Sequence, residues 1–122
     1  MSKVKIRTLL HNEKENKFYS DEVIGIKDNK IKFVSDSVTN IIEISNNIVS
    51  LKRRSSEYEI DMIFELNSVT KGKYMINDLG YFNLEIKTNK MLIKENYIEI
   101  EYLMNLDGEK TCFNYKIEVE DL

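Results

Sequence analysis

The sequence has no proline and no tryptophan, and its 122 residues include only one cysteine, one histidine and four glycines. The single cysteine, Cys112, excludes an intramolecular disulfide, which fits a reducing compartment. The single histidine, His11, lies in a polar stretch and offers little for metal ligation or for a catalytic triad. The lack of proline is compatible with a strand-rich fold, because proline cannot donate a hydrogen bond to a β-ladder.

Long apolar runs are also missing. The basic start of the chain, residues 2–7, is not followed by an apolar stretch of signal-peptide length, and no later run approaches a membrane span. We therefore expect a cytoplasmic protein that does not bind membranes. Its formal net charge of −3 provides no bulk attraction to phosphate backbones, so we expect no binding of double-stranded nucleic acid.

The dominant pattern is an alternation of apolar and polar residues with a period of two, which is typical of half-buried β-strands. It is clearest in three segments, residues 58–66, 98–106 and 113–119. Weaker alternation predicts further strands at residues 4–10, 18–27, 30–35, 38–44, 48–54, 73–76, 82–88 and 91–94. Residues 68–72 are expected to form a loop or a single helical turn.

Turn-forming residues separate these segments, at positions 28–29, 46–47, 54–56, 77–80, 88–90 and 107–108. Asn, Asp and Gly tolerate the positive φ that tight hairpins demand, so the pattern predicts an all-β antiparallel meander. A long meander leaves edge strands exposed unless it closes. We therefore expect residues 1–122 to form a single β-barrel domain.

Several segments resemble the YwiB-like family of small bacterial proteins of unknown function. The segments are residues 49–54, 62–64, Tyr74 followed by Gly80, 84–88 and 102–105, and the resemblance extends from about Glu22 onward. It implies a calycin-type, lipocalin-like barrel. The chain departs from the family pattern at residues 77–80 and at Arg54, which weakens the idea of shared chemistry near that turn.

Arg53 is the most informative candidate for a functional residue. Its phase with Val49 and Leu51 directs it into the barrel, where a guanidinium needs a partner. Glu22, in phase with Ile24 and Ile26, is the expected carboxylate partner. Four tyrosines are expected to contribute inward hydroxyls: Tyr58, Tyr74, Tyr102 and Tyr115. The set forms either a salt bridge that closes one end of the barrel or a site that holds the carboxylate or phosphate of a ligand.

These observations favour a non-enzymatic calycin-like barrel that binds a small amphiphilic or anionic molecule, or a protein partner, and needs no metal or cofactor. One alternative is an enzyme that uses Arg53, Glu22 and the inward tyrosines. Another is an RNA-associated accessory protein with contacts through basic edges. Apolar residues on two outward faces, Ile63 and Leu103, suggest in addition a homodimer.

Overall fold

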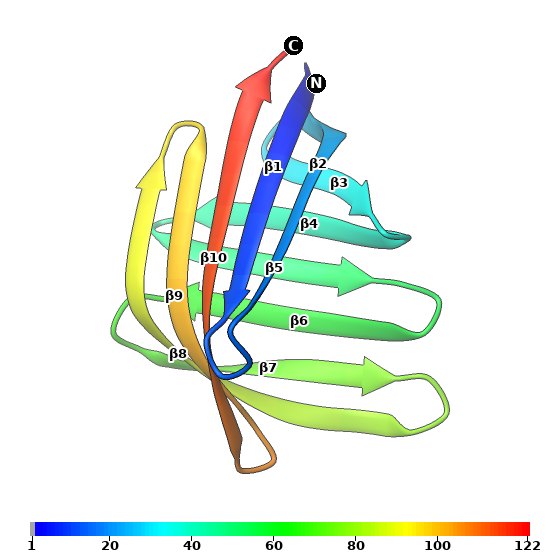
Figure 1. Ribbon diagram of the computed structural model, residues 1–122, viewed down its shortest axis with the longest axis vertical. Coiled ribbons are helices and arrows are strands. Elements are labelled where there is room, and N and C mark those ends of the chain that lie inside the picture. The colour runs from blue at the N-terminus through cyan, green and yellow to red at the C-terminus, as the bar shows by residue number, and fades with distance from the viewer. Residues whose placement is uncertain (1) are drawn as a thin grey trace.

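The computed structural model describes residues 2–122, which form ten antiparallel strands closed into a barrel (Figure 1). The strands are β1 (Ser2–Asn12), β2 (Lys17–Lys27), β3 (Lys30–Ser35), β4 (Val38–Ser45), β5 (Ile48–Arg54), β6 (Tyr58–Glu65), β7 (Val69–Ile76), β8 (Gly80–Lys94), β9 (Tyr97–Leu106) and β10 (Glu109–Asp121). Each strand pairs with the next along the chain, and β1 pairs with β10. The predicted antiparallel meander that closes into a barrel is confirmed.

Closure is made by the first and last strands, whose pairing runs from Val4 opposite Asp121 to Asn12 opposite Phe113. The start of β1 and the end of β10 consequently lie side by side (Figure 1). Closure gives every strand a neighbour on both sides, so unpaired backbone is confined to places where neighbouring strands pair over only part of their length.

Tight hairpin turns connect the strands, as the turn residues predict. Asn46 and Asn47 both have positive φ, 50° and 63°, and Asp107 and Gly108 have φ of 51° and 85°. Two consecutive residues with positive φ match the twist of a two-residue hairpin.

Two local predictions are wrong. The expected turn at residues 88–90 is a β-bulge inside β8, because β9 pairs along both halves of that long strand and the register shifts between Thr88 and Lys90. Residues 69–72, expected in a loop or helical turn, belong to β7, which pairs with β8 from Val69 onward.

The barrel interior is filled by the inward residues of the alternating strands. Phe64 and Ile86 are fully buried at its centre, together with Ile6 and Leu84. Tyr102 packs on Phe64 with ring centroids 4.8 Å apart. Much of the barrel is therefore a solid core, and any ligand site is confined to its ends.

The inward face of β2 differs from the prediction. In β1, Val4 and Ile6 are buried, and they stand opposite Gly25 and Val23 of β2. Because residues opposite each other in a ladder share a face, Val23 and Gly25 point inward, whereas Ile24 is 54% exposed. The expectation that residues 22, 24 and 26 face the interior is wrong.

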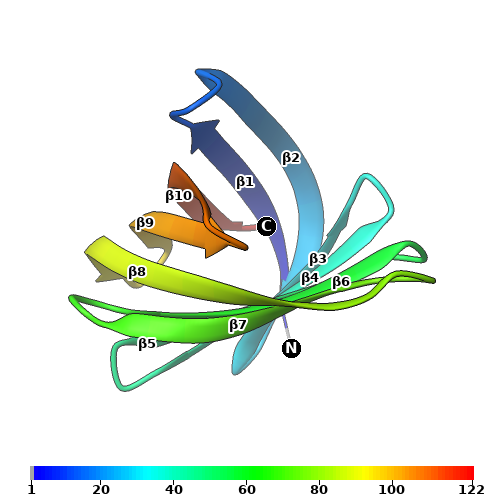
Figure 2. The same ribbon diagram turned by 90° about the horizontal axis from the view of Figure 1, so that it is seen from below.

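A glycine at the inward position 25 is required by the close approach of β3. A Cβ atom at Gly25 would lie 2.5 Å from Cδ1 of Ile6 and 2.6 Å from the carbonyl oxygen of Lys32. Beyond this point β2 and β3 separate, since they pair only at residues 26–27 with 31–32. Figure 2 shows the β1–β2 hairpin diverging from β3 and β4. Within residues 2–122, no helix is long and apolar enough to cross a membrane.

Candidate ligand-binding site

A cavity of about 340 Å³ opens where β2 and β3 separate. Eight segments line it, namely β1, β2, β3, the β3–β4 turn, β4, β5, β6 and β10. The lining residues are Thr8, Leu10, Tyr19, Ser20, Asp21, Phe33, Ser35, Asp36, Val38, Asn40, Arg53, Tyr58 and Tyr115. Ligand pockets occupy about 300–1,000 Å³, so this cavity suits a small molecule.

Arg53 lies at the inner end of the cavity, in the inward orientation that its phase predicts. Its Nε atom donates a hydrogen bond to Oδ1 of Asn40 at 3.1 Å. Asn40 is buried, and its amide nitrogen donates to the carbonyl oxygen of Val38 at 3.2 Å, which fixes the orientation of the amide. The guanidinium also lies over the ring of Tyr115, 5.6 Å from its centroid, in a cation–π contact.

No carboxylate within residues 2–122 forms an ion pair with Arg53. Its partners in that part of the chain are the neutral amide of Asn40 and the phenol ring of Tyr115. The positive charge of the guanidinium is therefore not offset by a carboxylate, and the N–H groups that Asn40 and Tyr115 do not use can serve another partner in the cavity.

The tyrosines around Arg53 are held in the protonated form. Burial raises the pKa of Tyr115, while the charge of Arg53 partly offsets that rise. Burial also raises the pKa of Tyr102, which is 5% exposed and does not line the cavity. These phenols can donate hydrogen bonds at neutral pH but do not serve as bases there.

The opposite wall carries a carboxylate, Asp21 of β2. One of its oxygens accepts a hydrogen bond from the hydroxyl of Ser35 across the gap between β2 and β3, and the other accepts one from the backbone N–H of Glu22 at 2.8 Å. Asp36, in the β3–β4 turn, is exposed at the rim. The rim therefore carries the carboxylate of Asp36, and the positive charge of Arg53 lies beside the buried Asn40 and Tyr115.

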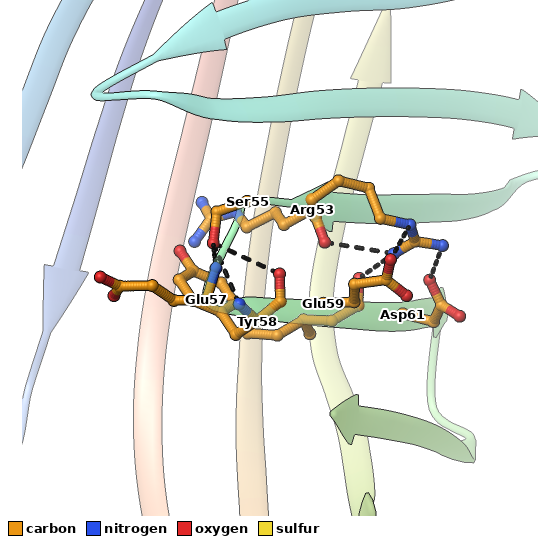
Figure 3. Close-up of polar contacts among 8 residues, drawn as sticks. Arg53, Ser55, Glu57, Tyr58, Glu59 and Asp61 are labelled. Carbon is orange, nitrogen blue, oxygen red and sulfur yellow. Dashed lines mark hydrogen bonds and ion pairs between the residues drawn. The ribbon is translucent and has the colours of Figure 1, made fainter. Parts of the chain in front are cut away.

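The predicted tyrosines divide into two groups. Tyr58 and Tyr115 line the cavity, whereas Tyr74 is outside it and packs edge-on against Tyr58 with ring centroids 5.9 Å apart. Tyr58 is positioned by the β5–β6 turn, where the hydroxyl oxygen of Ser55 accepts a hydrogen bond from the backbone N–H of Tyr58 at 3.1 Å (Figure 3).

Arg54, the neighbour of Arg53, belongs to the outer face of the same turn. Its guanidinium pairs with Asp61 at 2.8 Å and with Glu59 at 3.8 Å. Figure 3 shows this network of ion pairs and backbone contacts beside the labelled Glu59 and Asp61. The two consecutive arginines thus differ in their partners, because alternation places them on opposite faces.

Glu22 is not in the site. It lies on the outer face of β2, where its Oε1 accepts a hydrogen bond from Nε of Arg7 at 2.7 Å. Arg7 also pairs with Glu120 of β10 at 2.9 Å. The expected Arg53–Glu22 salt bridge is wrong, and the Arg53, Glu22 and tyrosine set of the enzymatic alternative is not assembled.

Asp21 and Asn40 line the cavity but were not predicted from the sequence. The inward orientation of Asn40 could have been predicted, since Asn40 is two residues from Ile42 in β4 and lies on the same buried face. The inward orientation of Asp21 could not be predicted, because both faces of residues 18–27 carry apolar side chains. Only the pairing with β1 decides which face is inward. Among the described residues, no three His, Cys, Asp or Glu side chains gather to hold a metal ion.

Comparison with known proteins agrees with this architecture. The sequence model of a family described as "Domain of unknown function (DUF1934)" matches residues 28–119. The structure is similar to that of the YwiB protein from Bacillus subtilis, with a TM-score of 0.67 and 18% sequence identity over 98% of this chain and 90% of that chain. No curated protein matches. The resemblance to the YwiB-like family and the calycin-like barrel that it implies are confirmed, and an identity this low shows the fold alone.

Proposed function

The chain belongs to the DUF1934 family, whose description assigns no activity, and from the geometry of its cavity we propose that it binds, inside the barrel, a small amphiphile that carries an anionic group. The observation that carries this proposal is Arg53, a cation at the inner end of an open cavity whose partners in the described chain are neutral. A carboxylate or phosphate would supply the charge-assisted hydrogen bonds that the guanidinium lacks.

The other walls support an amphiphile rather than a bare anion. Leu10, Phe33 and Val38 present apolar surface to the cavity, and Tyr58 and Tyr115 add aromatic rings with hydroxyls. Small-molecule sites typically combine such apolar walls with a few polar groups that fix the orientation of the ligand. In this proposal the barrel binds and carries its ligand without chemical change, in the cytoplasm of a bacterium.

Native mass spectrometry of the protein purified from its own host tests the proposal, with Arg53→Gln and Arg54→Gln as a matched pair. Both variants lose one positive charge from the same strand, but only Arg53 lines the cavity. We expect a retained small molecule in the unmodified protein and in Arg54→Gln, and its loss in Arg53→Gln. Equal retention in both variants would place the ligand elsewhere and contradict the proposal.

A further inference from the structure

Two opposite charges line the cavity without pairing with each other. Asp21 projects from β2 and Arg53 from β5, and no ion pair joins them in the described chain. Each is oriented by uncharged partners instead: Asp21 by the hydroxyl of Ser35 and a backbone N–H, and Arg53 by the amide of Asn40. The cavity therefore has a negative wall and a positive wall, both held in place.

Arg53 and Asp21 are both half-buried, whereas Asp36 is exposed. Arg53 contacts the buried ring of Tyr115. Asp36 lies in the β3–β4 turn and adds a second negative charge at the rim. A ligand that carries only negative charge would meet Arg53 favourably, but its other end would lie against two carboxylates.

From this separation of charge we infer that the ligand is a small zwitterion, with its anionic group at Arg53 and a cationic group, such as an ammonium, at Asp21. The inference rests on the proposed function, because it names the ligand class of the same cavity. Between the two charged walls, Phe33 and Leu10 provide apolar contact for a short hydrocarbon or aromatic linker. An ammonium is a donor of three hydrogen bonds and matches the acceptor-only carboxylate of Asp21.

Calorimetric titration with matched probes tests this inference. The probes are ω-amino carboxylates with chains of about four to eight carbons, unsubstituted carboxylates of the same lengths, and the corresponding alkylammonium ions. We expect the best amino carboxylate to bind at least about tenfold more tightly than the carboxylate of equal length, since it gains a charge-assisted contact.

Two neighbouring positions on β2 provide the variant and its control. Asp21→Asn removes the inward carboxylate, whereas Glu22→Gln removes a carboxylate from the outer face. The advantage of the amino carboxylate should disappear in Asp21→Asn and persist in Glu22→Gln, while the affinity for the plain carboxylate stays within about threefold or rises in Asp21→Asn. Circular dichroism of both variants establishes that the barrel is intact.

The failures of the two proposals are distinguishable. If plain carboxylates bind as tightly as amino carboxylates and depend on Arg53, the zwitterion inference is overturned and the proposed function stands. If amino carboxylates bind but Asp21→Asn keeps their full advantage, Asp21 is not the cation site and the inference is again overturned. If no probe binds to the unmodified protein, both proposals are contradicted.

Discussion

Nε of Arg53 donates a 3.1 Å hydrogen bond to Oδ1 of Asn40, a buried amide on the neighbouring strand. An amide in this place orients the guanidinium without cancelling its charge, which an aspartate of nearly the same shape would do. This distinction explains how the cavity can keep a cation available for an anionic ligand.

Replacing Asn40 by aspartate should therefore block the site from within. In Asn40→Asp the new carboxylate pairs with Arg53 and competes with the ligand, so the affinity for a carboxylate probe should fall by at least about tenfold. Titration calorimetry measures the fall, and thermal unfolding should show that the barrel persists. Thr39→Asp adds the same charge to the outer face of the same strand and is the control. Similar affinities in the two variants would argue against a site at Arg53.

A methyl group at position 25 should destabilise the barrel. The Cβ atom in Gly25→Ala would meet the backbone oxygen of Lys32 at 2.6 Å, which cannot be relieved by rotating a side chain. We expect a loss of about 2 kcal/mol in the free energy of unfolding, measured by urea denaturation. Ile24→Ala, at a position that is 54% exposed, should change the stability by less than about 0.5 kcal/mol. A neutral Gly25→Ala would mean that β2 and β3 can move apart at low cost.

Removing the hydroxyl of Thr88 should stabilise the protein. Thr88 is 0% exposed at the β8 bulge, and its Oγ1 has no hydrogen-bond partner in the described part of the chain. Thr88→Val keeps the shape and removes the unsatisfied polar atom, so the free energy of unfolding should rise by about 1 kcal/mol. Thr88→Ala should be less stable than Thr88→Val, because it also loses a buried methyl group. Destabilisation by valine would indicate that the hydroxyl does find a partner in solution.

The stability of the barrel should decline at alkaline pH, and Tyr102 should account for part of the decline. Burial raises its pKa above the ordinary value of 10.0, so its contribution is intact below about pH 10. Above that pH the unfolded chain releases the proton while the folded barrel retains it, and unfolding becomes more favourable by up to about 1.4 kcal/mol per pH unit.

Tyr102→Phe should therefore lose less stability than the unmodified protein between about pH 9 and pH 11, as measured by urea denaturation at several pH values. Tyr81→Phe, at a position that is 72% exposed, controls for the loss of a phenol group. If the free energy of unfolding depended on pH in the same way in the unmodified protein and in Tyr102→Phe, Tyr102 would not account for the alkaline decline.

Self-association through the outer face remains a prediction from the sequence. Ile63 is 42% exposed on β6, although Leu103 on β9 is half-buried. If a two-fold interface uses the outer face that carries Ile63, Ile63→Lys should dissociate the dimer, because the two introduced lysines would face each other and repel. A monomeric mass for the unmodified protein at tens of micromolar, measured by light scattering, would contradict the predicted homodimer.

Much of the architecture could be predicted from alternation and turn chemistry. Residues 58–66 and 98–106 have one apolar face each, and the structure buries Met62, Phe64, Ile98 and Ile100 on those faces. The hairpin at Asn46–Asn47 follows from the tolerance of asparagine for positive φ. Alternation also directed Arg53 into the barrel correctly. These features are local, since they depend only on residues adjacent in the chain.

The sequence by itself therefore determined a closed antiparallel barrel with an arginine inside it. Only the tertiary structure decided which residues line the cavity together with Arg53. Residues 18–27 are apolar on both faces, so the inward face of β2 is set by its pairing with β1, and this pairing turns Asp21 in and Glu22 out. The cavity itself exists because β2 and β3 pair at only two positions. Such a separation depends on packing between distant segments, which no local pattern encodes.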